Sequence, residues 1–289
     1  MRRVHPGWIL FYTLCGLIIA FLVLPIFIVF PTSLSPVSYL QFPPKTISLQ
    51  WYRELADNPE WLASALLSIR IGLMAAAISV VFGTLTATGI NRARFRGKEV
   101  ITAILISPMI VPVIVLAIGI YYLFVDWHLI GNPLAIAAGH AVLGFPFVLV
   151  NVSVAYQTLD PSLEQAARSM GAGPFTAFFK VTFPLIRSGI ISGALFAFIT
   201  SFDELVIALF CADIHNTTLP IRLWNGIRYE MTPVIAAVSS IIFLTYIVGY
   251  LLFETVSLLR LRNSRRAARV GGGSEGLHPL QGNIDDTIS

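Results

Sequence analysis

Charged residues are scarce in this sequence. Asp, Glu, Lys and Arg make up 12% of its 289 residues, whereas hydrophobic residues make up 56% and the mean hydropathy is +0.79. Ordinary soluble domains carry about twice that share of charge, so the composition excludes that class. Cysteine is scarce as well. Cys15 and Cys211 both fall in apolar segments, which argues against a disulfide framework and favours buried, inert thiols.

Several motifs of catalytic chemistry are missing too. The sequence contains no G-x-x-x-x-G-K-[ST] phosphate loop, no HExxH metal-binding motif and no CxxC pair. We therefore expect no ATPase activity, no metal site and no bound cofactor in this chain. The net charge of +4 does not indicate nucleic-acid binding, because the basic residues flank apolar stretches and have no interleaved aromatic platform.

Long apolar stretches, by contrast, are abundant. A helix needs about 20 apolar residues to cross the roughly 30 Å core of a bilayer. Six stretches have this length: 8–30, 62–90, 101–125, 133–157, 188–212 and 233–253. The first follows Arg2 and Arg3, but it is too long for a signal peptide and lacks a small-residue cleavage site, so we interpret it as a retained helix. The sequence predicts an all-α membrane protein with about six transmembrane helices.

The basic residues predict the orientation of these helices. Cytoplasmic connections are enriched in Lys and Arg. With the N-terminus inside, the outer side holds Lys45, Arg53, Arg222 and Arg228. The inner side holds Arg2, Arg3, Arg92, Arg94, Arg96, Lys98, Arg168, Lys180, Arg187, Arg260, Arg262, Arg265, Arg266 and Arg269. Because an even number of spans returns the chain to its starting side, both termini are predicted to be cytoplasmic.

The chain divides into three parts. Residues 1–61 form an N-terminal membrane helix and an outer connection, residues 62–253 a five-helix membrane domain, and residues 254–289 a basic cytoplasmic end. The glycine-rich tail from residue 270 is predicted to be disordered, and no function is assigned to it. Four prolines fall inside the spans: Pro25, Pro108, Pro112 and Pro146. They predict kinks, which suit bent packing helices as well as a wall around a translocation path.

The inner connection between the fourth and fifth spans has the pattern of a folded helix. Asp160 can cap a helix that begins at Pro161, where the missing N–H is harmless. Gly171 suits the left-handed residue that ends it, and a second short helix is predicted over 175–180. One face of the first helix carries Leu163, Ala166, Ala167 and Met170. Such an amphipathic helix can dock into a groove of a soluble partner or lie on the lipid headgroups.

This connection resembles the cytoplasmic loop of binding-protein-dependent ABC permeases, the type I importers. That loop reads E-A-A, three residues, G, nine residues, I-x-L-P. The matching residues here are Gln165, Ala166, Ala167, Gly171, Val181, Phe183 and Pro184. Three of them depart conservatively, at 165, 181 and 183, and Glu164 stands beside the first. The resemblance covers roughly residues 62–253.

The resemblance implies a fold and a set of partners. It implies a type I importer transmembrane domain in a bacterial inner membrane, with a coupling helix that sits in a cleft of an ATPase subunit. ATP and Mg would be used by that subunit, present in two copies, and not by this chain. A second permease, expected to be a paralogue, and a periplasmic solute-binding protein would complete the complex. The coupling residues it implies are Glu164, Gln165, Ala166, Ala167, Gly171 and Pro184.

The chain is most similar to the spermidine/putrescine branch of that family. The supporting stretches are SPMIVPVIVLAIG in the third span, His140 with Phe145 and Pro146 in the fourth, SFDELVIALF in the fifth, and TTLPIRLWNGIR in the outer loop that follows. The branch implies a polyamine as the solute. It also includes importers of other amines, opines and amino-acid-like solutes, so these stay open.

Ionisable residues inside spans mark candidate pathway residues, because a charge in hydrocarbon usually faces a cavity or a partner. Asp203 and Glu204 lie about sixteen residues along the fifth span, and Arg70 lies at a similar depth in the second. We expect Arg70 to pair with one of the two acids while the other faces the pathway. A purely structural ion pair is the alternative. His140 in the fourth span is a further candidate, or a hydrogen-bonded packing residue.

Two other functions are compatible with a multi-span chain. A stand-alone secondary transporter would require inverted internal repeats, and the sequence shows none. An intramembrane enzyme would have to use Asp203, Glu204 and His140, and activity without partner subunits would reveal it. The importer permease is the better prediction.

Overall fold

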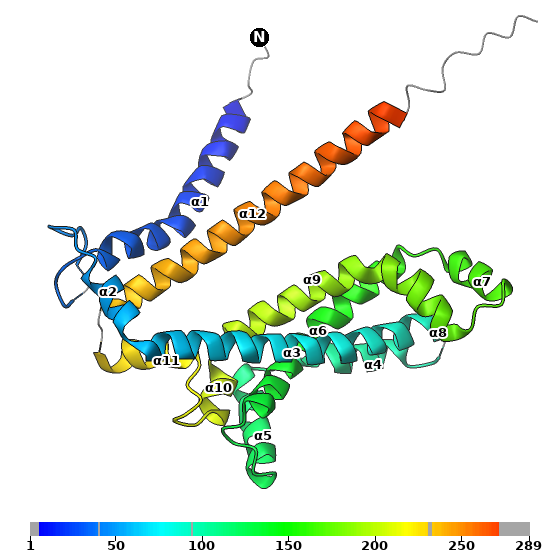
Figure 1. Ribbon diagram of the computed structural model, residues 1–289, viewed down its shortest axis with the longest axis horizontal. Helices are drawn as coiled ribbons and strands as arrows, with labels where there is room; N and C mark the ends of the chain where they lie inside the picture. The colour runs from blue at the N-terminus through cyan, green and yellow to red at the C-terminus, as the bar shows by residue number, and fades with distance from the viewer. Residues whose placement is uncertain (1–5, 40, 94, 231–232, 272–289) are drawn as a thin grey trace, which may run out of the picture. The chain divides into compact units, whose positions relative to one another are not determined.

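The computed structural model describes residues 6–39, 41–93, 95–230 and 233–271. All regular elements in these residues are helical. The chain forms two compact units, which consist of the described parts of Met1–Val37, Gln41–Ser48 and Ala236–Ser289, and of Ser38–Leu40 and Leu49–Ile235 (Figure 1). The expected all-α membrane fold is confirmed.

The first unit contains α1 (Pro6–Ser33) and most of α12 (Val234–Gly271). Both helices carry apolar windows long enough to cross a membrane. Phe30 of α1 and Phe243 of α12 make an edge-to-face contact with ring centroids 5.6 Å apart. The tail predicted to be disordered starts at residue 270, where α12 still continues to Gly271, and residues 272–289 lie outside the described part of the chain.

The second unit is built on three long helices that run side by side: α3 (Pro59–Arg92), α6 (Pro133–Gln157) and α9 (Phe183–Phe202) (Figure 1). Glycines allow their close approach. A Cβ added to Gly83 of α3 or to Gly193 of α9 would lie 2.7 Å from an atom of Val148 on α6. Small residues at such crossings let helix backbones pack tightly where lipid offers no hydrophobic drive. Val148 is fully buried and forms the centre of this three-helix contact.

Two of the six predicted spans are broken. The third consists of α4 (Lys98–Ile106), a 3₁₀ turn η1 (Ser107–Met109) and α5 (Val113–Asp126), with a bend of 93°. Pro108 and Pro112 flank the bend, and each lacks the N–H that would continue the helix. The described residues thus hold five helices able to cross a membrane, or six if the bent pair is one span. The kink predicted in this span from Pro108 and Pro112 is therefore present, as a sharp bend.

The fifth span breaks at Asp203–Leu205, between α9 and the short helix α10 (Val206–Cys211). The depth estimated for Asp203 and Glu204 assumed an unbroken helix over 188–212, which the structure does not have. α10 packs beside α5 (Figure 1), where the rings of Phe210 and Tyr121 lie 6.1 Å apart. The C-terminal segments of both broken spans, α5 and α10, thus share one apolar cluster.

Short helices connect the spans. α2 (Gln50–Asp57) precedes α3, and α11 (Leu219–Asn225) with the π-helical turn η3 (Gly226–Glu230) follows α10. α7 (Pro161–Ser169), α8 (Pro174–Ala177) and the π-helical turn η2 (Phe178–Thr182) join α6 to α9. α7 and α8 lie at the end of the three-helix core opposite to α11 (Figure 1).

Candidate coupling segment and pathway residues

The local structure predicted for the inner connection is confirmed. The Asp160 carboxylate accepts a hydrogen bond from the Ser162 N–H at 2.9 Å, and Pro161 occupies the first turn of α7. That backbone hydrogen bond lowers the pKa of Asp160. Gly171 has φ +88°, so the chain turns there in the left-handed conformation. A Cβ at Gly171 would meet no atom within 4 Å, which means that its backbone conformation, and not crowding, requires glycine.

The second short helix is confirmed in a different form. It begins at Pro174, changes to the π-helical turn at Phe178 and continues directly into α9. Pro184 stands in the first turn of α9, directly after the π-helical turn, and cannot donate the backbone hydrogen bond that would continue the helix through this point. The connection is therefore joined to the fifth span without a flexible linker.

The apolar face predicted for α7 is mostly not buried. Of its four residues only Ala167 is buried, at 8% exposure. Leu163 is 47% exposed, Met170 83%, and Phe175 of α8 is 78% exposed. Gln165 and Ala166 are exposed as well. The segment thus presents apolar side chains that nothing in the described chain covers.

Glu164, by contrast, points toward the rest of this subunit. Its carboxylate pairs with Arg92 at the end of α3, accepts a hydrogen bond from Thr182 Oγ1 at 3.0 Å, and pairs with Arg168 at 2.8 Å. Partial burial by itself raises the pKa of Glu164, but the Thr182 hydrogen bond and the nearby Arg92 and Arg168 outweigh it and lower the pKa below its usual value. The carboxylate is thus held ionised at neutral pH.

Glu204 is the buried member of the acidic pair. Its side chain is 6% exposed. Its two oxygens accept hydrogen bonds from the N–H groups of Val206, Ile207 and Ala208 at 3.0, 2.8 and 3.2 Å, so that it caps α10. His140 of α6 lies on its other side, with Nε2 3.5 Å from Oε2. His140 Nδ1 lies 2.8 Å from Ser201 Oγ.

The expected ion pair between Arg70 and an acid of the fifth span is not formed. Arg70 and Asp203 are both exposed, and Glu204 lies against His140 instead, with Nε2 3.5 Å from Oε2. The expectation assumed a continuous helix through residue 203. Because α9 ends at Phe202, the chain turns and Glu204 folds back onto α10. The structure brings Glu204 and His140 together and leaves Arg70 apart.

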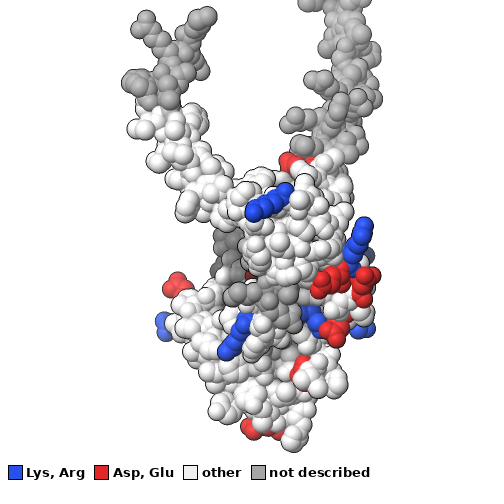
Figure 2. Space-filling model, turned by 90° about the vertical axis from the view of Figure 1, so that its left-hand side faces the viewer, with Lys and Arg blue, Asp and Glu red and all other residues white. Residues whose placement is uncertain are grey.

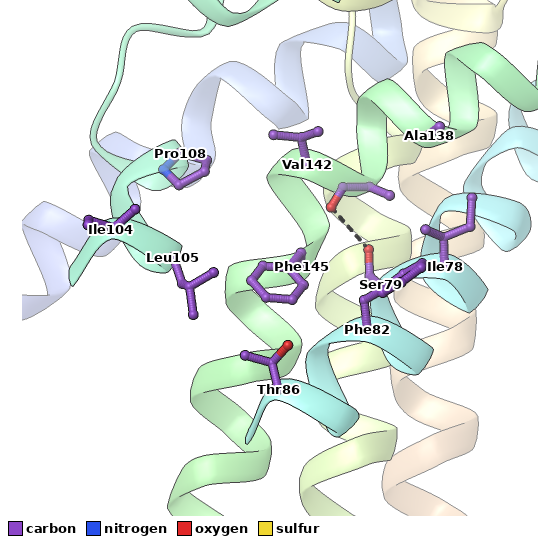
Figure 3. Close-up of a pocket in the computed structure, with 11 residues that line it drawn as sticks. Ile78, Ser79, Phe82, Thr86, Ile104, Leu105, Pro108, Ala138, Val142 and Phe145 are labelled. Carbon is purple, nitrogen blue, oxygen red and sulfur yellow. Dashed lines mark hydrogen bonds between the residues drawn. The ribbon is translucent and has the colours of Figure 1, made fainter. Parts of the chain in front are cut away.

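A cavity of about 470 Å³ lies between α3, the α4–η1 bend and α6 (Figure 3). Its lining is apolar, apart from Thr86 and from Ser79, whose hydroxyl donates to the Ala141 carbonyl at 3.3 Å. Sequence analysis missed it, because its lining comes from three segments that are far apart in the sequence. The face of the molecule in Figure 2 is largely uncharged, with Lys, Arg, Asp and Glu in small groups. In the described part of the chain no three His, Cys, Asp or Glu side chains could jointly hold a metal ion.

Apolar spans that pack through glycines, with a capped helix between the fourth and fifth, define a multi-pass membrane permease. The sequence pattern of the family "Binding-protein-dependent transport system inner membrane component" matches residues 79–259. The chain belongs to this family. It is a permease subunit of an ABC importer in the inner membrane and not an enzyme, because ATP hydrolysis in the family takes place on a separate subunit.

Curated relatives place the chain in the spermidine/putrescine branch. It is 34% identical over 233 residues to the putrescine transport system permease protein PotI of Escherichia coli (strain K12), covering 77% of this chain and 83% of that protein. It is 29% identical over 223 residues to the spermidine/putrescine transport system permease protein PotC of Haemophilus influenzae, covering 77% and 86%. The molybdenum transport system permease protein ModB of Escherichia coli (strain K12) is 34% identical over 167 residues, covering 52% and 71%.

Solved structures share the fold. A bacterial ABC transporter that imports the acidic polysaccharide alginate has a chain with a TM-score of 0.69 and 19% identity, covering 89% of this chain and 97% of its own. An amino acid ABC transporter with histidines has a TM-score of 0.52 and 20% identity, covering 73% and 99%. At these identities the likeness concerns the fold alone.

Proposed function

We propose that this subunit imports a small polyamine, of the putrescine or spermidine kind, by alternating access. The similarity to PotI and PotC over more than three quarters of the chain carries this proposal. A paralogous permease, two copies of an ATPase that uses ATP and Mg, and a periplasmic binding protein complete the complex. Both termini lie in the cytoplasm, as the positive-inside bias of the sequence indicates.

The segment around α7 docks in a cleft of the ATPase. The exposed side chains of Leu163, Met170 and Phe175 support this role, since a large uncovered apolar group outside the membrane favours a protein partner. Gln165, Ala166, Ala167, Gly171 and Pro184 belong to the same segment. ATP-driven closure of the ATPase subunits moves this segment and opens the pathway outward.

Asp203 is the pathway acid, and Glu204 is the structural one. The two adjacent carboxylates differ in their surroundings: Asp203 is exposed at the end of α9, whereas Glu204 is occupied by three backbone N–H groups. The carbonyl end of a helix carries partial negative charge, which adds to that of Asp203 and favours a primary ammonium group. Glu204 and His140 hold the break in the span.

Uptake into proteoliposomes tests the solute and the role of Asp203 together. The complete complex is assayed with putrescine, spermidine, ornithine and molybdate, each with the loaded binding protein. We expect saturable, ATP-dependent putrescine or spermidine uptake, and a slower uptake by Asp203→Asn with unchanged complex yield and basal ATP hydrolysis. Uptake of neither polyamine would refute the solute, and normal uptake by Asp203→Asn would refute the pathway role.

An anionic or amino-acid-like solute is the second candidate. Arg70 is an exposed cation in α3 without a described ion pair, and a guanidinium is suited to a carboxylate or an oxyanion. The similarity to ModB over about half of the chain agrees with that chemistry. Ornithine or molybdate uptake that Arg70→Gln abolishes, with no polyamine uptake, would favour this candidate.

A further inference from the structure

We propose that Arg92 is a positioning residue that fastens the coupling helix α7 to the membrane helix α3 and passes the movement of α7 into the membrane core. The inference rests on the coupling role proposed for α7. Arg92 lies in the last turn of α3, about 70 residues before Glu164 in sequence, and outside the loop that resembles the family motif. The sequence motif therefore gives no indication of a role for Arg92, and the inference rests on the contacts that its side chain makes in the folded chain.

One guanidinium contacts three groups on the inner connection. Arg92 Nη2 donates to the Glu164 carboxylate of α7 and to Thr182 Oγ1 of η2, the latter at 3.1 Å. Thr182 Oγ1 in turn donates to Glu164 at 3.0 Å, so that the three polar groups form a closed triangle. The guanidinium also lies over the Phe178 ring, 5.4 Å from its centroid. We call these four residues the Arg92 clamp.

The acceptors of the Arg92 clamp are partly shielded from water. The Glu164 side chain is 15% exposed and Thr182 is fully buried, whereas the Arg92 side chain is 32% exposed. A pair of charges attracts more strongly where water is partly excluded. A planar guanidinium with several fixed donors also defines the geometry of its partners better than an ammonium does. The clamp therefore holds α7 in one orientation and does not merely attract it.

The end of α3 is itself tied to α6. Asn91 Nδ2 donates to Ser153 Oγ at 3.0 Å, and the Tyr156 hydroxyl donates to Thr88 Oγ1 at 3.0 Å. Among the ion pairs of the described residues, the one between Arg92 and Glu164 joins α7 to a membrane helix. A displacement of α7 is therefore transmitted to α3, and through α3 to α6, instead of being absorbed by the turns around α7.

The Arg92 clamp also places Glu164 and its neighbour Gln165 in different surroundings. Glu164 was expected to contact the ATPase together with Gln165. Its carboxylate is committed to Arg92, whereas Gln165 is exposed on the outside of α7. Glu164 thus acts inside the subunit, and Gln165 remains available to the partner.

The test compares ATP hydrolysis by the complete complex with and without the loaded binding protein. The solute is the one that the wild-type complex transports in the uptake assay above, so the result does not depend on which solute that is. We expect Arg92→Ala to assemble and hydrolyse ATP at the basal rate, but to lose about fivefold or more of the stimulation by the binding protein. The charge reversal Arg92→Glu with Glu164→Arg should recover at least half of it.

Arg96→Ala is the matched control. It removes the same charge four residues away, from an exposed side chain that forms no ion pair with any described residue, and should leave stimulation unchanged. Wild-type stimulation in Arg92→Ala would overturn the proposal. So would low complex yield together with normal stimulation of the complex that does assemble, because Arg92 would then be merely structural.

Gly171→Val separates the Arg92 clamp from the coupling role on which it rests. If Gly171→Val abolishes stimulation and Arg92→Ala does not, the clamp is refuted and the coupling role stands. If neither variant alters stimulation, the coupling role of the whole segment is refuted, and the clamp with it.

Discussion

Substitution of the two adjacent acids at the break of the fifth span, Asp203 and Glu204, should alter the stability of the protein to very different extents. Glu204→Ala removes the acceptor of three backbone N–H groups, in a place where the side chain is only 6% exposed and water cannot take its place. An unsatisfied buried N–H costs about 1–3 kcal/mol, and loss of a helix N-cap costs about 1 kcal/mol. α10 has only six residues and can partly rearrange, which recovers some of these costs. We therefore expect Glu204→Ala to lower the free energy of unfolding by about 3–5 kcal/mol in total.

Glu204→Gln and Asp203→Ala are the matched comparisons. Gln keeps one acceptor oxygen but turns an NH₂ group toward the N–H groups of α10. We therefore expect Glu204→Gln to lower the free energy of unfolding by an intermediate amount, about 1–2 kcal/mol. Asp203 is exposed, and its replacement by Ala should alter the free energy of unfolding by no more than about 0.5 kcal/mol. The order of stability should be Asp203→Ala, then Glu204→Gln, then Glu204→Ala.

Thermal unfolding of the detergent-solubilised complex, followed by size-exclusion chromatography, measures this order. A loss of about 3 kcal/mol corresponds to a decrease in Tm of roughly 6–12 °C for a chain of this size. The reasoning would be refuted if Glu204→Ala unfolded at the wild-type temperature, or if Asp203→Ala were the less stable of the two alanine variants.

Three further predictions concern other parts of the chain. Gly171→Ala should lower stimulated ATP hydrolysis and Gly171→Asn should largely preserve it, because Asn tolerates the positive φ at this position; equal activities would argue against a backbone role. Gly193→Leu should prevent assembly, measured as complex yield, since even a Cβ would lie 2.7 Å from the Val148 Cα. A reporter that is active only outside the cytoplasm, fused after Arg269, should stay silent, and activity would reverse the predicted topology.

The fold class and the short helix α7 could be predicted from local patterns. Apolar length predicts a span because the bilayer thickness is constant. The short helix α7 has its own start and stop signals in Asp160, Pro161 and Gly171, and each signal acts within a few residues of its position. These features need no information about distant parts of the chain.

The partners of the ionisable residues could not be predicted in this way. The depth of each residue in its span, counted along an ideal helix, predicted that Arg70 lies beside Asp203 and Glu204. That estimate holds only if both helices are continuous. The break after Phe202 turned Glu204 toward the α10 backbone and His140. The prolines of the third span predicted a kink, but neither its angle of 93° nor the cavity that Pro108 lines together with α3 and α6.

The sequence by itself determined that this chain crosses a membrane several times and carries a capped helix between the fourth and fifth spans, because hydropathy and capping act over short stretches of chain. Only the tertiary structure decided that Glu204 accepts the hydrogen bonds of the α10 backbone while Asp203 is exposed, and that Glu164 pairs with Arg92. The physical reason is that a buried charge is satisfied by whichever donor the packing of the helices brings within hydrogen-bond distance. For Glu164 that donor lies on a helix that ended about 70 residues earlier.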